Sequence, residues 1–182
     1  MTYLCSIYKI TEDNGESQGE EGEDITFGII DSFDYVDDET QYVIVSYDKK
    51  VMLEGAFNKS NLGVFESMYP DFYYSEWVIK LTDNTYNPTM YRLNKNSDGK
   101  YAISMENNFG TYYLIPDTYD LFDIDTEPYY YEISFNDFDA IIKDPNSGKV
   151  LRYDGNFKLY NENETSGTEP VRLYGFITNE VE

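Results

Sequence analysis

The residues with the clearest chemical potential lie in one stretch, "DTYDLFDIDTEPYYYEISFNDFDA", at positions 117–140. It holds eight carboxylates and seven aromatic rings in twenty-four residues, and no Lys or Arg occurs between residues 101 and 142. Carboxylates at this density repel one another unless they stay hydrated or meet cations. The rings can bury inward as a rigid base or lie along the surface. The stretch therefore predicts a surface that binds positively charged groups.

Two acidic patches supply the residues that we expect to contact a partner. The first patch comprises Asp117, Asp120, Asp123, Asp125 and Glu127, and the second comprises Asp34, Asp37, Asp38 and Glu39. Hot spots of binding favour buried aromatic side chains over charges at the rim of an interface. The expected apolar anchors are therefore Tyr119, Phe122 and Tyr129. A third acidic segment, "EDNGESQGEEGED" at 12–24, has no apolar residue and is expected to be a mobile loop.

The usual catalytic residues are missing from the sequence. It has no histidine, which excludes Ser-His-Asp and Cys-His triads and the commonest general base. Cys5 lies in an apolar stretch and is expected to be a buried structural thiol. No phosphate-binding glycine loop or nucleophile elbow occurs. Two carboxylates can hydrolyse glycosides, but among 35 acidic residues some pair is always suitably spaced, so this signal has no value. We expect no enzymatic activity and no cofactor.

One segment resembles a calcium-binding loop without completing it. "NKNSDGKYAISME" places side-chain oxygens at Asn94, Asn96 and Asp98 before Gly99, like the start of an EF-hand loop. Its twelfth position is Met105, where the loop needs a bidentate Glu, and no helix is apparent on either side. Asn, Asp and Gly also dominate tight turns. A β-turn therefore explains the segment better, and no metal site is expected.

Short runs rich in Tyr, Val, Ile and Phe recur along the chain with turn residues between them, which is typical of antiparallel strands. Asp98-Gly99 between two such runs predicts a hairpin, and the similar segments 93–109 and 141–157 predict two alike. Helix is expected at 59–70, with Ser60 as N-cap, and for a turn or two within 134–144, with Asn136 as cap. The predicted fold is mainly β, or α+β with one or two short helices, as antiparallel sheets joined by hairpins in a single domain over 1–182.

Charge and cysteine content set limits on the environment of the chain. Its 182 residues include 35 acidic and 13 basic side chains, for a net charge of −22. That exceeds the magnitude of roughly 2–8 that keeps a small domain soluble. A single cysteine fits a reducing cytosol, and we find no signal-peptide pattern and no apolar run of membrane-spanning length. We expect a cytoplasmic protein without membrane contact.

A rigid surface of carboxylates can imitate nucleic acid. Duplex DNA presents one negative charge per about 1.7 Å of its axis, and proteins that bind it present grooves of Arg and Lys. An acidic protein can occupy such a groove, while Tyr rings add stacking surfaces for guanidinium groups. Direct binding to nucleic acid is disfavoured by the same charge. A general acidic bias, as in halophilic proteins, explains the charge without a binding role.

In this overall character the chain resembles the type II anti-CRISPR proteins, which phages use against bacterial defence. The features that support the resemblance are "EDNGESQGEEGED", "DSFDYVDDET" at 31–40 and "DTYDLFDIDTE" at 117–127. It implies an inhibitor that binds a type II CRISPR effector nuclease in the bacterial cytoplasm and blocks DNA binding or cleavage, by DNA mimicry in some cases. The resemblance includes no alignable motif, so it assigns no individual residue a role.

Two other classes of function stay open. A Tyr-rich β domain can bind carbohydrate by stacking rings on sugar faces, although such a module is expected to carry a secretion signal. An acidic adaptor subunit of a larger assembly is the second alternative. Salt separates these interpretations, because an electrostatic mimic loses affinity steeply as ionic strength rises, whereas sugar stacking hardly changes.

Overall fold

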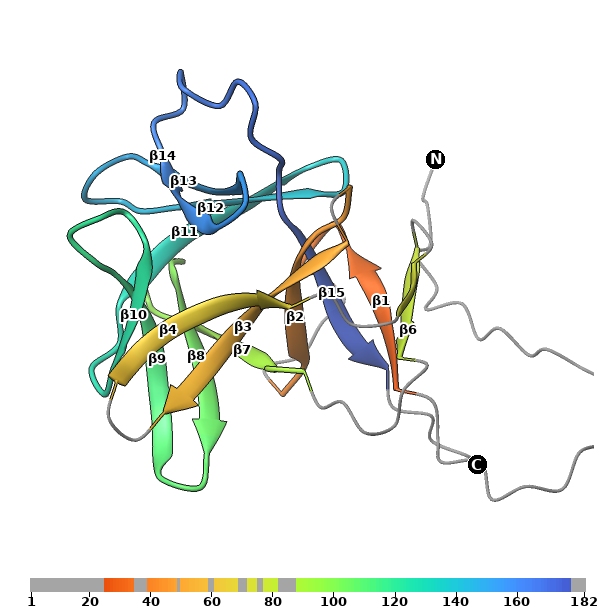
Figure 1. The fold of residues 1–182 in the computed structure, drawn as a ribbon, viewed down its shortest axis with the longest axis horizontal. Helices are drawn as coiled ribbons and strands as arrows, with labels where there is room; N and C mark the ends of the chain where they lie inside the picture. Colours follow the sequence, from red (N-terminus) through yellow and green to blue (C-terminus); the bar gives the residue numbers. More distant parts are fainter. Residues whose placement is uncertain are drawn as a thin grey trace, which may run out of the picture.

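A computed structural model describes residues 25–34, 39–48, 50–58, 61–68, 72–74, 77–81 and 88–177 (Figure 1). The mainly β prediction is confirmed: the described residues form fifteen strands, every strand pair is antiparallel, and no helix occurs among them. The strands are β1 (Thr26–Ile30), β2 (Gln41–Ser46), β3 (Val51–Asn58), β4 (Asn61–Met68), β5 (Phe72–Tyr74), β6 (Val78–Leu81), β7 (Tyr91–Lys95), β8 (Tyr101–Asn107), β9 (Gly110–Pro116), β10 (Phe122–Asp125), β11 (Tyr130–Asn136), β12 (Asp139–Lys143), β13 (Val150–Tyr153), β14 (Phe157–Tyr160) and β15 (Arg172–Ile177).

All fifteen strands belong to one hydrogen-bonded sheet. Its main path runs β14-β13-β12-β11-β8-β7-β2-β15-β1-β6-β5. The β3–β4 hairpin branches from β2, and the β9–β10 hairpin branches from β8. These two branches curve towards each other until β10 lies beside β4 (Figure 1). The larger core takes its buried side chains from β2, β3 and every strand from β7 to β15.

The strand β2 shows why the middle of the sheet is stable. Its apolar run puts Tyr42 and Ile44 into the larger core, while Val43 and Val45 point the other way into a smaller cluster with Phe27. Successive side chains of a strand lie on opposite faces, so a strand that is apolar at every position must be covered on both sides. All four of these β2 side chains are at most 2% exposed.

Buried tyrosines use their hydroxyl groups to join strands that do not pair with each other in the sheet. The Tyr91 hydroxyl donates to the backbone oxygen of Leu53 at 3.0 Å, and the Tyr131 hydroxyl donates to the backbone oxygen of Leu114 at 3.2 Å. Both tyrosines are fully buried. A buried hydroxyl without a partner would cost free energy, so these bonds allow the rings to fill the core.

The predicted hairpins at 93–109 and 141–157 are confirmed, and an Asx side chain organises the first turn of each. The Asn96 Oδ1 accepts from the backbone N–H of Asp98 and Lys100, and Gly99 has φ +79°. The Asp144 carboxylate accepts from the backbone N–H of Asn146 and Ser147. The backbone bond that closes the first turn joins residues 96 and 100, whereas the second joins residues 144 and 149. The second turn is thus one residue longer, and Gly148 accordingly stands one position later in its segment than Gly99 does in the first.

Both predicted helices are wrong where the structure describes them. Within 59–70, residues 61–68 form β4, which pairs with β3 from Met52↔Met68 to Asn58↔Asn61. Within 134–144, β11 and β12 meet in a two-residue turn, closed by the pair Asn136↔Asp139. A neighbouring strand was available to pair with each segment, and such tertiary pairing overrides a weak helical pattern.

Several expectations concern residues outside the described part of the chain: Cys5, the acidic loop 12–24, Asp37, Asp38 and Ser60. In the part that is described, no helix has the length and apolar character needed to cross a membrane.

Candidate interaction surface

The first acidic patch forms the turn and outer edge of the β9–β10 hairpin. The two strands pair from Pro116↔Phe122 to Tyr113↔Asp125, so residues 117–121 make the connecting turn. The Asp117 Oδ1 accepts from the backbone N–H of Tyr119 at 2.7 Å and of Leu121 at 2.9 Å. An Asx side chain that bonds the backbone two or more residues ahead is a standard way to close a turn. Asp117 therefore shapes the turn that presents the rest of the patch.

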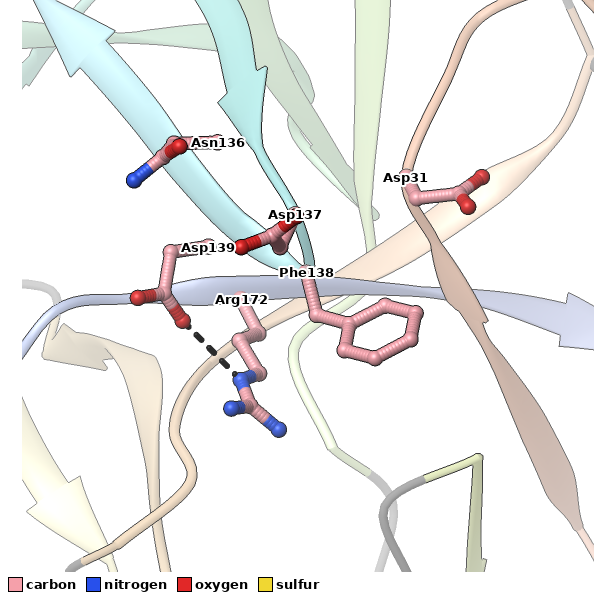
Figure 2. A pocket seen from close by; sticks show the side chains of 6 residues that line it. All are labelled: Asp31, Asn136, Asp137, Phe138, Asp139 and Arg172. Carbon is pink, nitrogen blue, oxygen red and sulfur yellow. Dashed lines mark hydrogen bonds and ion pairs between the residues drawn. The ribbon is translucent and has the colours of Figure 1, made fainter.

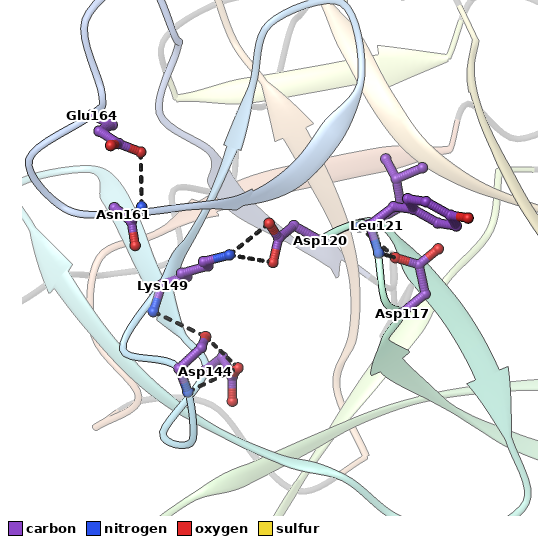
Figure 3. Close-up of polar contacts among 9 residues, drawn as sticks. Asp117, Asp120, Leu121, Asp144, Lys149, Asn161 and Glu164 are labelled. Atoms are coloured by element: carbon purple, nitrogen blue, oxygen red, sulfur yellow. Dashed lines mark hydrogen bonds and ion pairs between the residues drawn. The ribbon is translucent and has the colours of Figure 1, made fainter.

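Asp120 is neutralised inside the fold. Its two carboxylate oxygens lie 2.5 and 2.6 Å from the Lys149 Nζ, and its backbone oxygen accepts from the Leu159 N–H at 2.7 Å (Figure 3). The residue also has φ +63°, a conformation that Asp tolerates better than most residues. These contacts fasten the turn to β13 and β14. Asp120 thus holds the patch in place, and its charge is already matched by Lys149.

The remaining carboxylates of the first patch differ in how far their side chains are exposed to solvent. Asp123 is half-buried, and its Oδ1 accepts from the neighbouring Ile124 N–H at 2.8 Å. Asp125 is exposed, and its Oδ1 accepts from the backbone N–H of Thr126 and Glu127. Glu127 is exposed too. Bonds from backbone amides do not cancel a carboxylate's charge, so Asp125 and Glu127 keep the hairpin edge negative.

The three expected anchors have different positions. Tyr119 is 79% exposed at the hairpin turn, so its ring is available to a partner. Phe122 is only 4% exposed, and its expected role as an anchor is therefore wrong, because its side chain packs in the larger core. Tyr129 is half-buried, and its ring lies 5.1 Å from that of Tyr131. One anchor of the three is thus presented fully to solvent.

Tyr129 belongs to a polar network that is only partly buried. Its hydroxyl donates a short hydrogen bond to Asp144 and accepts one from the Asn146 side chain at 2.8 Å. Burial and the bond to Asp144 raise the pKa of Tyr129 to about 12. The Asp144 side chain also accepts from the Ser147 hydroxyl. The network fixes the start of β11 to the β12–β13 turn.

The raised pKa makes a specific prediction for alkaline solution. The neutral phenol is favoured in the folded state, so its stabilisation is present below its usual value of 10 and is lost as the pH rises towards about 12. A Tyr129→Phe variant should be less stable at neutral pH by about 1.5–3 kcal/mol, the usual worth of a hydrogen bond to a charged group. Urea unfolding across this pH range should show the difference shrinking. A difference that stays constant would contradict the assignment, and Tyr119→Phe serves as the exposed control.

The second acidic patch is only partly described. Asp34 and Glu39 are both exposed, on either side of the undescribed residues 35–38. Asp34 lies in the segment that follows β1, where its backbone N–H donates to the Ser32 hydroxyl at 3.1 Å. Whether Asp37 and Asp38 join them stays a prediction.

Sequence reasoning missed Lys149, which lies 29 residues from Asp120, and no local pattern links the two. It also missed an open hollow beside Arg172, which lies at the turn of the β11–β12 hairpin (Figure 2). Among the described residues, no group of three or more acidic or Cys side chains is placed to hold a metal ion. In the segment that resembles an EF-hand loop, Asn96 closes the turn and the Asn94 amide donates to the Ser104 hydroxyl at 2.7 Å.

Comparison of the chain with protein-family models, with curated proteins and with solved structures finds no match. The geometry and charge of the surface itself are therefore the guide to function.

Proposed function

We propose that this chain is an acidic inhibitor that binds the basic nucleic-acid-binding surface of a type II CRISPR effector nuclease in the bacterial cytoplasm. It would block DNA binding or cleavage by occupying the groove that holds DNA. It would act by binding and not by catalysis.

What supports the proposal is the charge balance among the described side chains. Of the thirteen Lys and Arg residues, Lys9, Lys49 and Lys59 lie outside the described part, which leaves ten. At least six of these ten already pair with a carboxylate of the chain: Arg92, Lys100, Lys143, Lys149, Lys158 and Arg172. Exposed carboxylates that pair with no cation among the described residues are Asp31, Asp34, Asp48, Asp98, Asp125, Glu127, Asp137 and Glu164. The basic residues are thus mostly used within the fold, and the negative surface is left for a partner.

The β-sheet suits this role because it holds its charges in fixed positions. The β9–β10 hairpin carries Asp125 and Glu127 on an edge that Asp120 and Lys149 fasten to β13 and β14. Fixed charges attract a complementary surface without the entropic cost of ordering a loop on binding. Tyr119 adds an exposed ring in the turn at the other end of β10, on which an Arg of the partner can stack.

The test is binding to guide-loaded type II effector nuclease, with and without target DNA, at low and high salt. We expect salt-sensitive binding that suppresses DNA loading. Asp125→Asn together with Glu127→Gln should weaken it by roughly tenfold, since each exposed ion pair is worth up to about 1 kcal/mol. The Asp125→Asn substitution keeps a side-chain oxygen that can accept from the Thr126 N–H. Asp117 and Asp120 are left unchanged because they shape the turn.

The matched control removes two charges elsewhere, with Asp48→Asn and Asp98→Asn. Equal losses in both double variants would indicate attraction by net charge and would reject the hairpin edge as the interface. Binding that survives high salt and leaves DNA loading intact would support an inhibitor of the nuclease but would reject the mechanism of DNA mimicry. A lack of binding to the effectors tested would overturn the proposal.

A further inference from the structure

An open hollow of about 490 Å³ lies beside Arg172, away from the β9–β10 hairpin edge. Three segments distant in sequence line it: the residue after β1, the turn of the β11–β12 hairpin, and the first residue of β15 (Figure 2). The lining residues are Asp31, Asn136, Asp137, Phe138, Asp139 and Arg172. Their formal charges sum to −2, so the hollow disfavours an anionic ligand.

Arg172 forms a fixed wall of this hollow. Its Nε donates to the Asp139 carboxylate at 3.1 Å, and its guanidinium carbon lies 4.4 Å from the centre of the Tyr47 ring. Burial acts to lower the pKa of Arg172, but the bonds to Asp139 and Tyr174 outweigh it and raise the pKa. The guanidinium is thus charged and held in place. Asp139 is the carboxylate that this charge neutralises.

Two carboxylates on the rim remain unmatched. Asp31 and Asp137 are exposed, and neither side chain pairs with a group among the described residues. Asp137 occupies the hairpin turn with φ +53°. The geometry of this turn, and not a bond to a partner, sets the position of its side chain. The Nη1 of Arg172 is also buried without an acceptor among the described residues. This nitrogen has almost no accessible surface, so the hollow does not present it to a ligand.

A pair of aromatic rings, one exposed and one half-buried, completes the site. The Phe138 ring, which lines the hollow, meets the Trp77 ring edge to face at 4.9 Å between centroids. Trp77 is 56% exposed. Large aromatic side chains that stay exposed next to carboxylates provide a face on which a flat cation can stack. The site thus combines aromatic rings with carboxylates.

We propose that this hollow binds an arginine side chain of the basic partner, stacked on the Trp77–Phe138 pair and paired with Asp31 and Asp137. The inference deepens the proposed function and rests on it for the identity of the partner. Arginine fits better than lysine, because its planar guanidinium can stack on a ring while it donates to two carboxylates. The hollow thus adds a second contact to the hairpin edge.

Trp77 is the only tryptophan of the chain, so its fluorescence reports on this site directly. The full-length chain is titrated with a capped Arg-Gly peptide, and in parallel with the same peptide in which citrulline replaces arginine. Citrulline has almost the same shape but no charge. We expect the arginine peptide to change the Trp77 emission at a concentration at least about tenfold lower than the citrulline peptide.

Asp31→Asn together with Asp137→Asn should raise the required concentration roughly tenfold. Asn is suitable at 137 because it tolerates a positive φ. The double variant Asp48→Asn and Asp98→Asn removes the same charge elsewhere and should leave the titration unchanged. Circular dichroism of each variant checks that the sheet is intact.

Equal responses to arginine and citrulline would overturn the inference, and so would an unchanged titration of the Asp31 and Asp137 variant. A response to a neutral oligosaccharide at lower concentration than to the arginine peptide would overturn it in favour of sugar binding. The assay contains no nuclease, so it separates the two proposals. Arginine binding in a chain that binds no effector would retain the site and reject only the proposed partner.

Discussion

Tyr131→Ala should lower the free energy of unfolding by about 3–5 kcal/mol, the usual cost of removing a large buried aromatic side chain. Tyr131 is fully buried in the larger core, and its ring lies 5.1 Å from Tyr129 and 6.4 Å from Phe122. Its hydroxyl also joins β11 to β9 through the Leu114 oxygen. The variant therefore loses both a packed ring and the bond that positions the β9–β10 hairpin. For a chain of this size the melting temperature should fall by roughly 10 °C.

Two companion variants separate these contributions. Tyr131→Phe keeps the ring and removes the hydroxyl, which leaves the Leu114 oxygen without this donor and should cost about 1 kcal/mol. Tyr119→Ala removes the same side chain from an exposed position and should change stability by no more than about 0.5 kcal/mol. The measurement is urea unfolding followed by circular dichroism. A loss for Tyr131→Ala no larger than that for Tyr119→Ala would show that Tyr131 is not part of a packed core.

The strands were predictable because local signals and tertiary pairing agree in most of the chain. Apolar runs such as that of β2 and the turn pair Asp98-Gly99 specify strands and a hairpin by themselves. The helix predictions failed where the local sequence signal and the tertiary pairing disagree. Leu62, Phe65 and Met68 have helical spacing, yet β3 pairs with β4 along most of residues 61–68. At 134–144 the residues Asn136 and Asp137 cap helices well, but Asp137 equally tolerates the positive φ of a tight turn.

The first acidic patch was found from composition, but the roles within it needed the fold. The short alternation of Phe122 and Ile124 with Asp123 and Asp125 is a strand pattern, and it would have placed Phe122 inside. No such pattern predicts that Asp120 pairs with Lys149, because the ion pair forms only where two separate hairpins meet. The hollow at Arg172 was equally out of reach, since Asp31, Asp137 and Arg172 come together only through the sheet.

The two surfaces now divide the proposed binding into distinct tasks. The hairpin edge offers exposed charge, which mainly speeds encounter and is sensitive to salt. The hollow offers a ring pair and a concave wall beside its charges, which favours a specific contact with slower dissociation. If both proposals hold, substitutions at Asp125 and Glu127 act mainly on the association rate, and substitutions at Asp31 and Asp137 act mainly on the dissociation rate.

Asp144→Ala should be among the most damaging substitutions of a polar residue in this chain. Asp144 is only 4% exposed, and it accepts from Tyr129, Ser147 and the backbone N–H of Asn146. Truncation leaves these donors without their acceptor, although Tyr129 is half-buried and Asn146 and Ser147 are exposed, so water can reach them. Because each bond to a charged group is worth about 1.5–3 kcal/mol, we expect a loss of about 3 kcal/mol after partial rescue by water. Asp98→Ala is the control, since its exposed carboxylate also stands in a hairpin turn, and it should cost less than about 0.5 kcal/mol.

The pH dependence of stability provides an independent check on Asp144. Burial acts to raise its pKa, but the bonds from Ser147, Tyr129 and the backbone amides outweigh it, so the pKa falls below the usual 3.8. A depressed pKa means that the ionised form stabilises the fold at neutral pH and that this stability is lost as the pH falls below about 3.8. The stability difference between the wild-type chain and Asp144→Asn should therefore narrow in acid. A difference that is equal at pH 7 and in acid would mean that the charge of Asp144 does not stabilise the turn and that only the shape of its side chain does.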